Sequence, residues 1–423
     1  MGVRGLTRPE AASIIVTPAR GHGKLRDSRD ACRTVCAADK GRPMDFAIAP
    51  DQQAILDGID SFARRHLAPA EVRRRDRDRV PPYDLLPALA ELGVLGLAAP
   101  VEHGGLGLGW TTLALVQERL AGHAYFAASI CNRVVAFGLM TILKNGTTAQ
   151  RADLAPRLIA GRCLIALALS EPEAGTDAGA IRTRAERVTE GWRITGRKTW
   201  ISDAGGADYL LTPCRTAPGS MGTSGISLLL VPRVSTGIAM TELAKIGNNC
   251  MPSWDIGYDG VIVAADALIG RENEGFKALM STLHYARASM AASVTGAAQA
   301  AVDIALAHVK ERRQFGQPIG SFQAVRHMLA DMQTRVDQSR LMAWRLAWLI
   351  ETGRSCRREA AQAKLVATET LQFVTDRGMQ LLASAGYAAD SDMQRLWRDG
   401  RLYSFGEGTN EIQRDLIARE LGL

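Results

Sequence analysis

The stretch WRITGRKTWIS, residues 192–202, is rich in β-branched and aromatic residues and follows a glycine. Three similar short segments come after it: YLLTPCR (209–215), GISLLLVPR (225–233) and WDIGYDGVIV (254–263). Glycine, proline and asparagine separate them, and short β-rich runs between such residues indicate strands joined by turns. We therefore predict an antiparallel β-barrel or sandwich within residues 166–275.

Helical patterns lie on both sides of this β-rich region. Before it, apolar residues recur at helical spacing from DQQAILDGIDSFARRHL (51–67) to about residue 165. After it, long helices are expected at 284–313, 321–351 and 357–385. The 423 residues exceed the limit of about 250–300 for one core. We predict an α+β fold with an N-terminal helical domain (44–165), a middle antiparallel β-barrel domain (166–275) and a C-terminal four-helix bundle (276–423).

Composition excludes several classes of function. The net charge of +7 is dispersed and forms no one-sided basic stripe with aromatics, so nucleic-acid binding is not expected. The seven cysteines are scattered, and only Cys32 and Cys36 are close, without the further ligands that a zinc site needs. No apolar run reaches the ~20 residues that span a bilayer. These features favour reduced thiols, a cytoplasmic location, no metal and no membrane.

The first 43 residues are Arg-rich and irregular and lack the apolar core of a secretory signal. They are interpreted as a disordered extension or a start-site artefact. A transit peptide is a weaker alternative, because Asp27, Asp30 and Asp39 are acidic. The folded protein is expected to begin near Met44.

Glu407 stands between two glycines in SFGEGTNEIQRDL, residues 404–416. Asn410 and Gln413 have the spacing of a capping box, and Ile412, Leu416, Ile417 and Leu421 lie roughly on one helical face. Glu407 should therefore lie in a tight loop before a helix N-terminus, whose partial positive charge favours the ionised form. From this window alone, an ordinary capping carboxylate and a functional carboxylate remain equally open.

Five segments, in this order along the chain, closely resemble the signature segments of acyl-CoA dehydrogenases. They are LALSEPEAGTD (167–177), GRKTWISDAGG (196–206), ERRQFGQPIGSFQ (311–323), QLLASAGY (380–387) and GEGTNEIQR (406–414). The resemblance covers about residues 44–423. It implies an FAD-dependent enzyme with the helical, β-barrel and helical-bundle domains predicted above, assembled as a homodimer or homotetramer.

The resemblance places residues 167–176 around the flavin ring, with Ser170 near its polar edge, although the segment alone could be a polar turn. Trp200 alone is most simply a core aromatic. Its family counterpart packs on the flavin, with Ser202 two residues on, on the same strand face and close to flavin N5. The cofactor contacts implied in these two segments are Leu167, Leu169, Ser170, Thr176, Trp200, Ile201 and Ser202.

A second group of implied contacts belongs to the FAD of a partner subunit. Arg312, which alone reads as a solvated helix-end charge, would lie near the pyrophosphate, with Gln314, Phe315 and Gln323 nearby. Residues 380–384 would approach the same FAD through backbone amides. The family usually has two glycines where this chain has Ala383 and Ser384, a departure that bears on cofactor affinity. The remaining implied cofactor contacts are Gln380, Leu381, Leu382, Thr409 and Glu411.

The resemblance makes Glu407 the base that abstracts the α-proton of the thioester, while flavin N5 takes the β-hydride. Substrate entry expels water and should raise the pKa of Glu407 towards neutrality. One branch of the family carries its base immediately before a bundle arginine, but Ala286 precedes the matching Arg287 here. Implied substrate contacts are Thr176, His284, Arg287 and Gly408, although His284 could also be a satisfied core histidine.

The implied function is α,β-dehydrogenation of an acyl-CoA to the enoyl-CoA, with electrons passed to an electron-transfer flavoprotein. Alternatives are dehydrogenation of an acyl-carrier-protein thioester, enoyl-CoA reduction and an acyl-CoA oxidase. A non-catalytic thioester-binding protein is an alternative of another class. Gly406, where many relatives place a large aromatic, leads us to expect a short branched or otherwise bulky acyl group.

Overall fold

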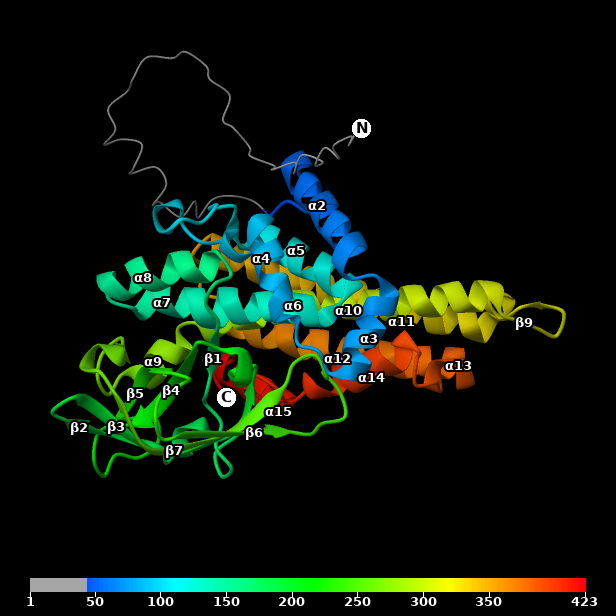
Figure 1. Cartoon of the computed structure of the whole chain (residues 1–423). Helices are drawn as coiled ribbons and strands as arrows, with labels where there is room; N and C mark the ends of the chain where they lie inside the picture. Colours follow the sequence, from blue (N-terminus) through cyan, green and yellow to red (C-terminus); the bar gives the residue numbers. More distant parts are fainter. Residues whose placement is uncertain (1–43) are drawn as a thin grey trace, which may run out of the picture. The chain divides into compact units, whose positions relative to one another are not determined.

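The computed structural model of the protein describes residues 44–423 (Figure 1). The interpretations of residues 1–43 lie outside the described residues. Within the described range, helices, a β-sheet and a second set of helices follow one another in the predicted order, which confirms the fold class. The first set of helices comprises α2 (Pro50–His66), α3 (Pro69–Asp78), α4 (Leu86–Glu91), α5 (Gly109–His123), α6 (Tyr125–Asn132), the π-helical segment η4 (Arg133–Leu139), α7 (Met140–Asn145) and α8 (Thr148–Ile159).

The β-rich region forms one eight-stranded sheet beside the helices (Figure 1). Its order is β6-β7-β3-β2-β4-β5-β8, and β1 pairs with β4. Most neighbours are antiparallel as predicted, but the β1–β4 and β2–β4 pairs are parallel. The strands are β1 (Ile165–Leu167), β2 (Arg184–Val188), β3 (Gly191–Ser202), β4 (Tyr209–Arg215), β5 (Ile226–Pro232), β6 (Ile238–Leu243), β7 (Ser253–Val263) and β8 (Leu268–Ile269).

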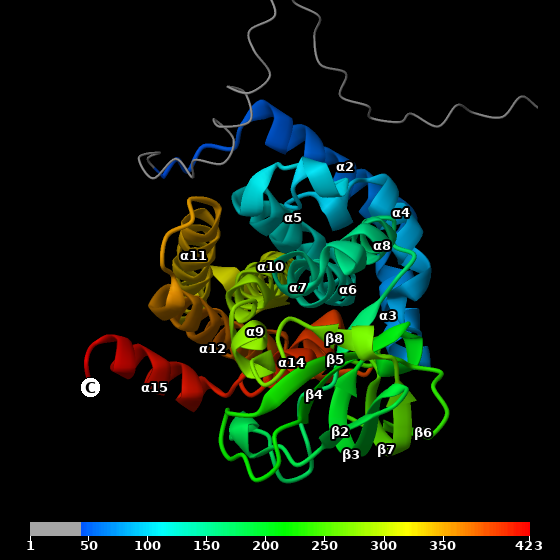
Figure 2. The same cartoon turned by 90° about the vertical axis from the view of Figure 1, so that its left-hand side faces the viewer.

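The third region is built around α10, which packs against α5, α11 and α12 (Figure 2). Its alanine-rich surface permits close approach: a Cβ at Gly296 would lie 2.0 Å from the carbonyl oxygen of Glu118 on α5. The N-terminal helices and the bundle therefore share one core. The elements are α9 (Gly275–Met280), α10 (Leu283–Glu311), β9 (Arg313–Gln314), β10 (Gln317–Pro318), α11 (Gln323–Glu351), α12 (Arg357–Leu382), α13 (Ser384–Tyr387), α14 (Asp392–Leu402) and α15 (Asn410–Glu420).

Two helical stretches correct the expectation that no apolar run is long enough to cross a membrane. By length and composition alone, Tyr125–Asn145 and Gly275–Glu311 are both long and apolar enough to cross a membrane. However, 94% and 67% of their apolar windows are buried inside the fold, which is how core helices of a soluble protein satisfy the same test. Their length follows from packing between other helices.

Candidate active site

An ion pair fixes the segment that precedes the β-domain's main strands. Lys198 on β3 is fully buried, and its Nζ donates to Glu171 Oε1 at 2.8 Å and to the carbonyl of Leu169 at 3.1 Å. The Glu171 carboxylate also accepts from the backbone N–H groups of Arg182 and Thr183. Burial lowers the pKa of Lys198, whereas Lys198 holds the pKa of Glu171 below its usual value against the opposing effect of burial. The pair thus joins residues 169–171 to β3.

Trp200 is not a core aromatic, because 57% of its surface is exposed. Its φ of 58° lies in the left-handed region, and the β3–β7 register shifts between Lys198 and Ile201. The shift interrupts the simple alternation from which Trp200 and Ser202 were expected to share a face, although both remain more accessible than the buried Ile201 between them. One residue earlier, the N–H of Thr199 donates to the carbonyl of Ser170 at 2.9 Å. The structure therefore brings the 167–170 segment beside Trp200.

Glu407 occupies the loop between α14 and α15 with a φ of 56°. Its Oε2 atom is buried and has no hydrogen-bond partner within the described part of the chain. Burial raises the pKa of the carboxyl above its ordinary value, against the charges of Arg133, Arg287 and Lys364, which act to lower it. Glu407 is thus a half-buried residue whose buried Oε2 atom is free to accept a proton.

The predicted cap of the following helix is wrong by one residue. Thr409 is the N-cap, and its Oγ1 accepts from the N–H of Ile412 at 3.3 Å. Asn410 is the first helical residue and is buried, with its Oδ1 accepting from Lys364 Nζ at 2.9 Å and from Thr368 Oγ1 at 3.0 Å. Gln413 donates to the carbonyl of Gly408 at 3.1 Å. Polar anchors to α12, more than the expected apolar face, hold α15 and the Glu407 loop in place.

The start of α10 carries two of the four predicted substrate residues, His284 and Arg287. Arg287 lies close to the Glu407 loop, since a Cβ on Gly408 would be 4.0 Å from its Nη2 atom. Burial lowers the pKa of Arg287, and its Nε is buried without a hydrogen-bond partner in the described structure. His284 stacks on Tyr285, and burial, with Lys144 and Arg287 nearby, lowers its pKa to about 4. His284 is therefore a neutral imidazole at physiological pH.

The second group of predicted contacts lies elsewhere on the chain. Arg312 caps the end of α10, Gln314 and Phe315 belong to the β9–β10 hairpin that follows, and Gln323 begins α11. This hairpin is at the end of α10 and α11 that points away from the sheet (Figure 1). Phe315 is 92% exposed with a φ of 51°. Within residues 44–423, no hydrogen bond or ion pair joins these residues to Trp200 or Glu407.

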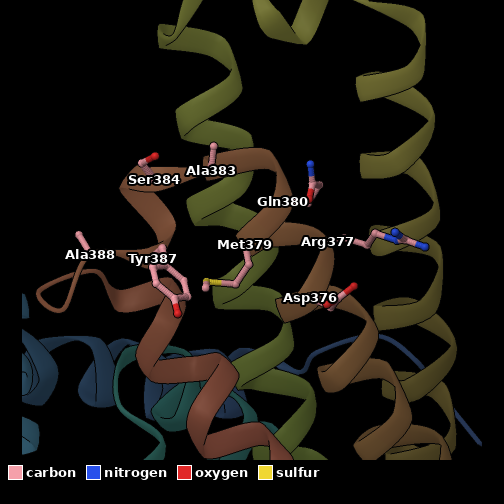
Figure 3. Close-up of a pocket in the computed structure, with 8 residues that line it drawn as sticks. All are labelled: Asp376, Arg377, Met379, Gln380, Ala383, Ser384, Tyr387 and Ala388. Atoms are coloured by element: carbon pink, nitrogen blue, oxygen red, sulfur yellow. The ribbon is translucent and has the colours of Figure 1, made fainter.

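The end of α12 and the start of α13 form an open pocket of about 550 Å³. Gln380, Ala383 and Ser384 line it together with Asp376, Arg377, Met379, Tyr387 and Ala388 (Figure 3). Leu381 and Leu382, in contrast, point into the core. Of the five residues predicted at 380–384, three thus face a hollow on the surface and two are buried.

The other predicted contacts are placed as follows. Leu167, Leu169 and Ser170 are half-buried beside β3, and Thr176 is exposed in the loop that follows. Thr409 is half-buried, whereas Glu411 is exposed on the first turn of α15. Gly408 has a φ of 91° and adjoins Gln413. These contacts therefore belong to two clusters, one around Trp200 and one around Glu407, apart from the hairpin and the pocket at residues 380–384.

Three families of protein domains match consecutive parts of the chain. They are described as the N-terminal domain (residues 49–162), the middle domain (166–261) and the C-terminal domain (273–422) of acyl-CoA dehydrogenase. The chain belongs to the acyl-CoA dehydrogenase family. Its reaction type is the FAD-dependent dehydrogenation of acyl thioesters, and the chain is an oxidoreductase acting on CH–CH groups.

Individual relatives agree with this assignment. The probable acyl-CoA dehydrogenase YngJ of Bacillus subtilis is 35% identical over 385 residues, which are 89% of this chain and all of that protein. Glutaryl-CoA dehydrogenase of Desulfococcus multivorans is 31% identical over 89% of this chain and 97% of its own. The structure of butyryl-CoA dehydrogenase from Megasphaera elsdenii aligns with a TM-score of 0.86 and 30% identity, covering 90% of this chain and 100% of that one.

Several features of this acyl-CoA dehydrogenase fit a flavin. An exposed tryptophan held at positive φ offers an aromatic face to a planar ring, and exposed aromatics of this size are otherwise costly in water. Ser170 and Ser202 are both half-buried, and the hydrogen bond between Thr199 and Ser170 brings the first of them beside the strand that carries the second. At position 383, alanine suits the backbone conformation less well than glycine would, because a φ of 50° with a ψ of −131° is disfavoured for a residue with a Cβ.

Ala383→Gly should therefore stabilise the protein by about 1 kcal/mol. The substitution relieves backbone strain of ~1–3 kcal/mol, and part of this gain is lost because glycine has more conformational entropy in the unfolded chain. Urea denaturation would measure this. Ala385→Gly is a matched control, because Ala385 lies in the helical turn α13 and glycine should there cost about 0.5–1 kcal/mol. Equal effects of the two substitutions would contradict the strain at Ala383.

Sequence reasoning missed Arg133, Asp203, Lys364 and the Lys198–Glu171 pair. Arg133 is an arginine within an apolar run, ICNRVVAFGLM (130–140), and that incongruity was a usable signal. The sequence gave no comparable indication that Lys198 and Lys364 are buried, since a lysine on a strand or helix is usually solvated. Their buried partners are 27 and 46 residues away along the chain.

Proposed function

We propose that this acyl-CoA dehydrogenase family member converts an acyl-CoA to the enoyl-CoA with Glu407 as the base. The observation that carries the proposal is the Oε2 atom of Glu407, which is buried, unpartnered and surrounded by cations. A carboxylate in such surroundings can accept the α-proton of a thioester, and its raised pKa brings it closer to the working pH. When bound, FAD would supply the two-electron acceptor for the hydrogen lost from the β-carbon.

Further proposals concern the binding of the two molecules. Residues 167–170, Trp200 and Ser202 would hold the flavin ring, and Thr176, His284, Arg287 and Gly408 the thioester. The backbone N–H of Glu407 would contribute to the grip on the thioester oxygen, where negative charge grows as the α-proton leaves. Thr409 and Glu411 adjoin the same loop.

A second copy of the chain would complete the cofactor site. The exposed hairpin with Arg312, Gln314 and Phe315, the start of α11 at Gln323 and the pocket at residues 380–384 would approach the partner's FAD. The support is the position of the β9–β10 hairpin at the end of α10 and α11 that points away from the sheet (Figure 1), and the 92% exposure of Phe315. We propose a homodimer or homotetramer, an electron-transfer flavoprotein as acceptor and a cytoplasmic location, the last supported by five buried cysteines without disulfides among the described residues.

The test is an anaerobic visible spectrum of the purified protein before and after addition of acyl-CoA thioesters of different acyl groups. Loss of the yellow flavin band on addition of a saturated acyl-CoA supports the proposal. A yellow protein that no acyl-CoA bleaches would favour a carrier-protein thioester or the reductase direction, and rapid reoxidation by oxygen would favour an oxidase. A protein that cannot take up FAD would overturn the enzymatic proposal.

The pH dependence of kcat/KM should show an acid limb that belongs to Glu407. Because burial raises its pKa above the ordinary value of 4.5, the ionised base is lost as the pH falls through this raised pKa. Activity should thus be highest above the limb and fall by tenfold per pH unit below it. A profile that stays flat down to pH 4.5 would contradict the assignment of Glu407 as the base.

A further inference from the structure

A single arginine lies inside one of the most apolar helical stretches of the protein. The most apolar 18-residue window within Tyr125–Asn145 has a mean hydropathy of 1.7, and Arg133 lies near the middle of this stretch with only 16% of its side chain exposed. Arg133 also begins the π-helical segment η4, and π-helical turns occur frequently at functional sites. A buried charge is costly unless a counter-charge and hydrogen bonds compensate it. The buried guanidinium of Arg133 therefore needs a counter-charge or hydrogen-bond acceptors.

The partner within the chain satisfies it only in part. Arg133 Nε donates to Asp203 Oδ2 at 3.3 Å, and Asp203 also accepts from the hydroxyl of Tyr83 at 3.2 Å. The guanidinium lies 5.2 Å from the ring of Phe137. Its two terminal nitrogens make no hydrogen bond or ion pair with residues 44–423. Four N–H donors are thus free to form the paired hydrogen bonds that arginine makes with a carboxylate.

The place of this guanidinium relates it to the reaction. Asp203 directly follows Ser202 at the end of the strand that carries Trp200. On its other side, Arg133 is the first of the three cations whose charges act on Glu407. Arg133 is thus bound at the end of β3 and is near enough to Glu407 for its charge to act on that carboxyl. In the proposed function, an acyl group whose α-proton reaches Glu407 would extend past this guanidinium.

We propose that Arg133 determines specificity by binding a carboxylate at the far end of the acyl group. The substrate would then be a CoA thioester of a short dicarboxylic acid. An acyl chain that ends in a methyl group would desolvate the guanidinium without offering it an acceptor, whereas a carboxylate replaces the lost water with charge-assisted hydrogen bonds. This inference rests on the proposed function, because it needs an acyl thioester beside Glu407.

The experiment measures binding with CoA thioethers, which lack the reactive thioester carbonyl and so do not turn over. Two ligands of equal length are compared by calorimetry on the FAD-containing protein, one ending in a carboxylate and one in a carboxamide. The wild type should bind the carboxylate about 10- to 100-fold more tightly, the range for hydrogen bonds to a charged group. In Arg133→Gln this preference should disappear, and Arg133→Lys should retain part of it.

Asp203→Asn is the matched variant that separates specificity from structure. It removes the carboxylate that competes for Arg133 while it keeps nearly the same shape, so the preference should persist or increase. If Arg133 and Asp203 formed only a structural tie, both variants would lower the melting temperature and neither would change the preference. An unchanged preference in both variants would overturn the proposal. Equal binding of both ligands by the wild type would also overturn it.

If Arg133→Gln does not fold, the proposal is still tested by comparing the carboxylate preference of the wild type with that of Arg133→Lys. Failure of the proposed function is a separate observation: no thioester would bleach the flavin, whatever the two thioethers show. A carboxylate preference without bleaching would then assign Arg133 to a thioester-binding protein and not to a dehydrogenase.

Discussion

Glu407→Gln should lower kcat by about 10²–10⁴-fold, the usual contribution of a positioned general base. Glutamine has nearly the same shape and can adopt the same φ of 56°, so the loop and the cap at Thr409 should be unaffected. The variant should still bind FAD and acyl-CoA, and its flavin should fail to bleach anaerobically. Because burial disfavours the charged carboxyl, the neutral side chain should leave the melting temperature unchanged or raise it.

Asp415→Asn is a suitable control for this substitution. Asp415 is on the exposed side of α15, where it pairs with Arg419 at 2.7 Å. Exposed pairs contribute about 0–1 kcal/mol, so both stability and turnover should stay close to those of the wild type. A Glu407→Gln protein that turns over within tenfold of the wild type would refute the role of Glu407 as base.

Lys198→Met should destabilise the protein by about 3–5 kcal/mol, the cost of leaving the other half of a buried ion pair without its counter-charge. Glu171 is 7% exposed and would keep only the N–H groups of Arg182 and Thr183 as partners. The carbonyl of Leu169 would also lose its donor. Since residues 169–171 are joined to the Trp200 strand through Lys198, FAD retention should fall together with stability. Urea denaturation and the flavin-to-protein absorbance ratio measure the two effects.

Two further variants test the physical cause. Arg197→Met removes the adjacent cation of the same strand, but its side chain is 63% exposed, so the loss should remain within about 1 kcal/mol. The double variant Lys198→Met/Glu171→Gln removes both charges and should be more stable than Lys198→Met alone. A double variant that is the less stable of the two would show that the ion pair is not the source of the effect.

Periodicity predicted the architecture well, because the elements have strong patterns and clear ends. The expected helices at 321–351 and 357–385 are α11 and α12 within three residues at each end, and the strand expected at 209–215 is β4 without change. The position of Glu407 in a loop before a helix was also predictable from its two glycines and the helix that follows, although its role was not. These features are local, and the sequence window that encodes them contains all their determinants.

The predictions that were wrong depend on contacts between distant residues. Asn410 was expected to cap its own helix, but a lysine and a threonine on α12 compete for its side chain, and Thr409 takes the cap. The register shift against β7 between Lys198 and Ile201 was not predicted, although Trp200 and Ser202 still flank the buried Ile201. The surroundings of Arg133 were missed for the same reason, because Asp203 is 70 residues away. No local pattern contains such information.

Eight residues other than glycine have φ values between 50° and 65° in the described part of the chain. Half of them had been assigned to the site from sequence: Trp200, Phe315, Ala383 and Glu407. A programme of thermostabilisation that replaces left-handed residues with glycine would select these positions among its first targets. At Ala383 that choice is expected to improve the protein, whereas at Trp200 and Glu407 it would remove the aromatic face and the carboxylate themselves. Resistance to heat and turnover would then have to be selected together.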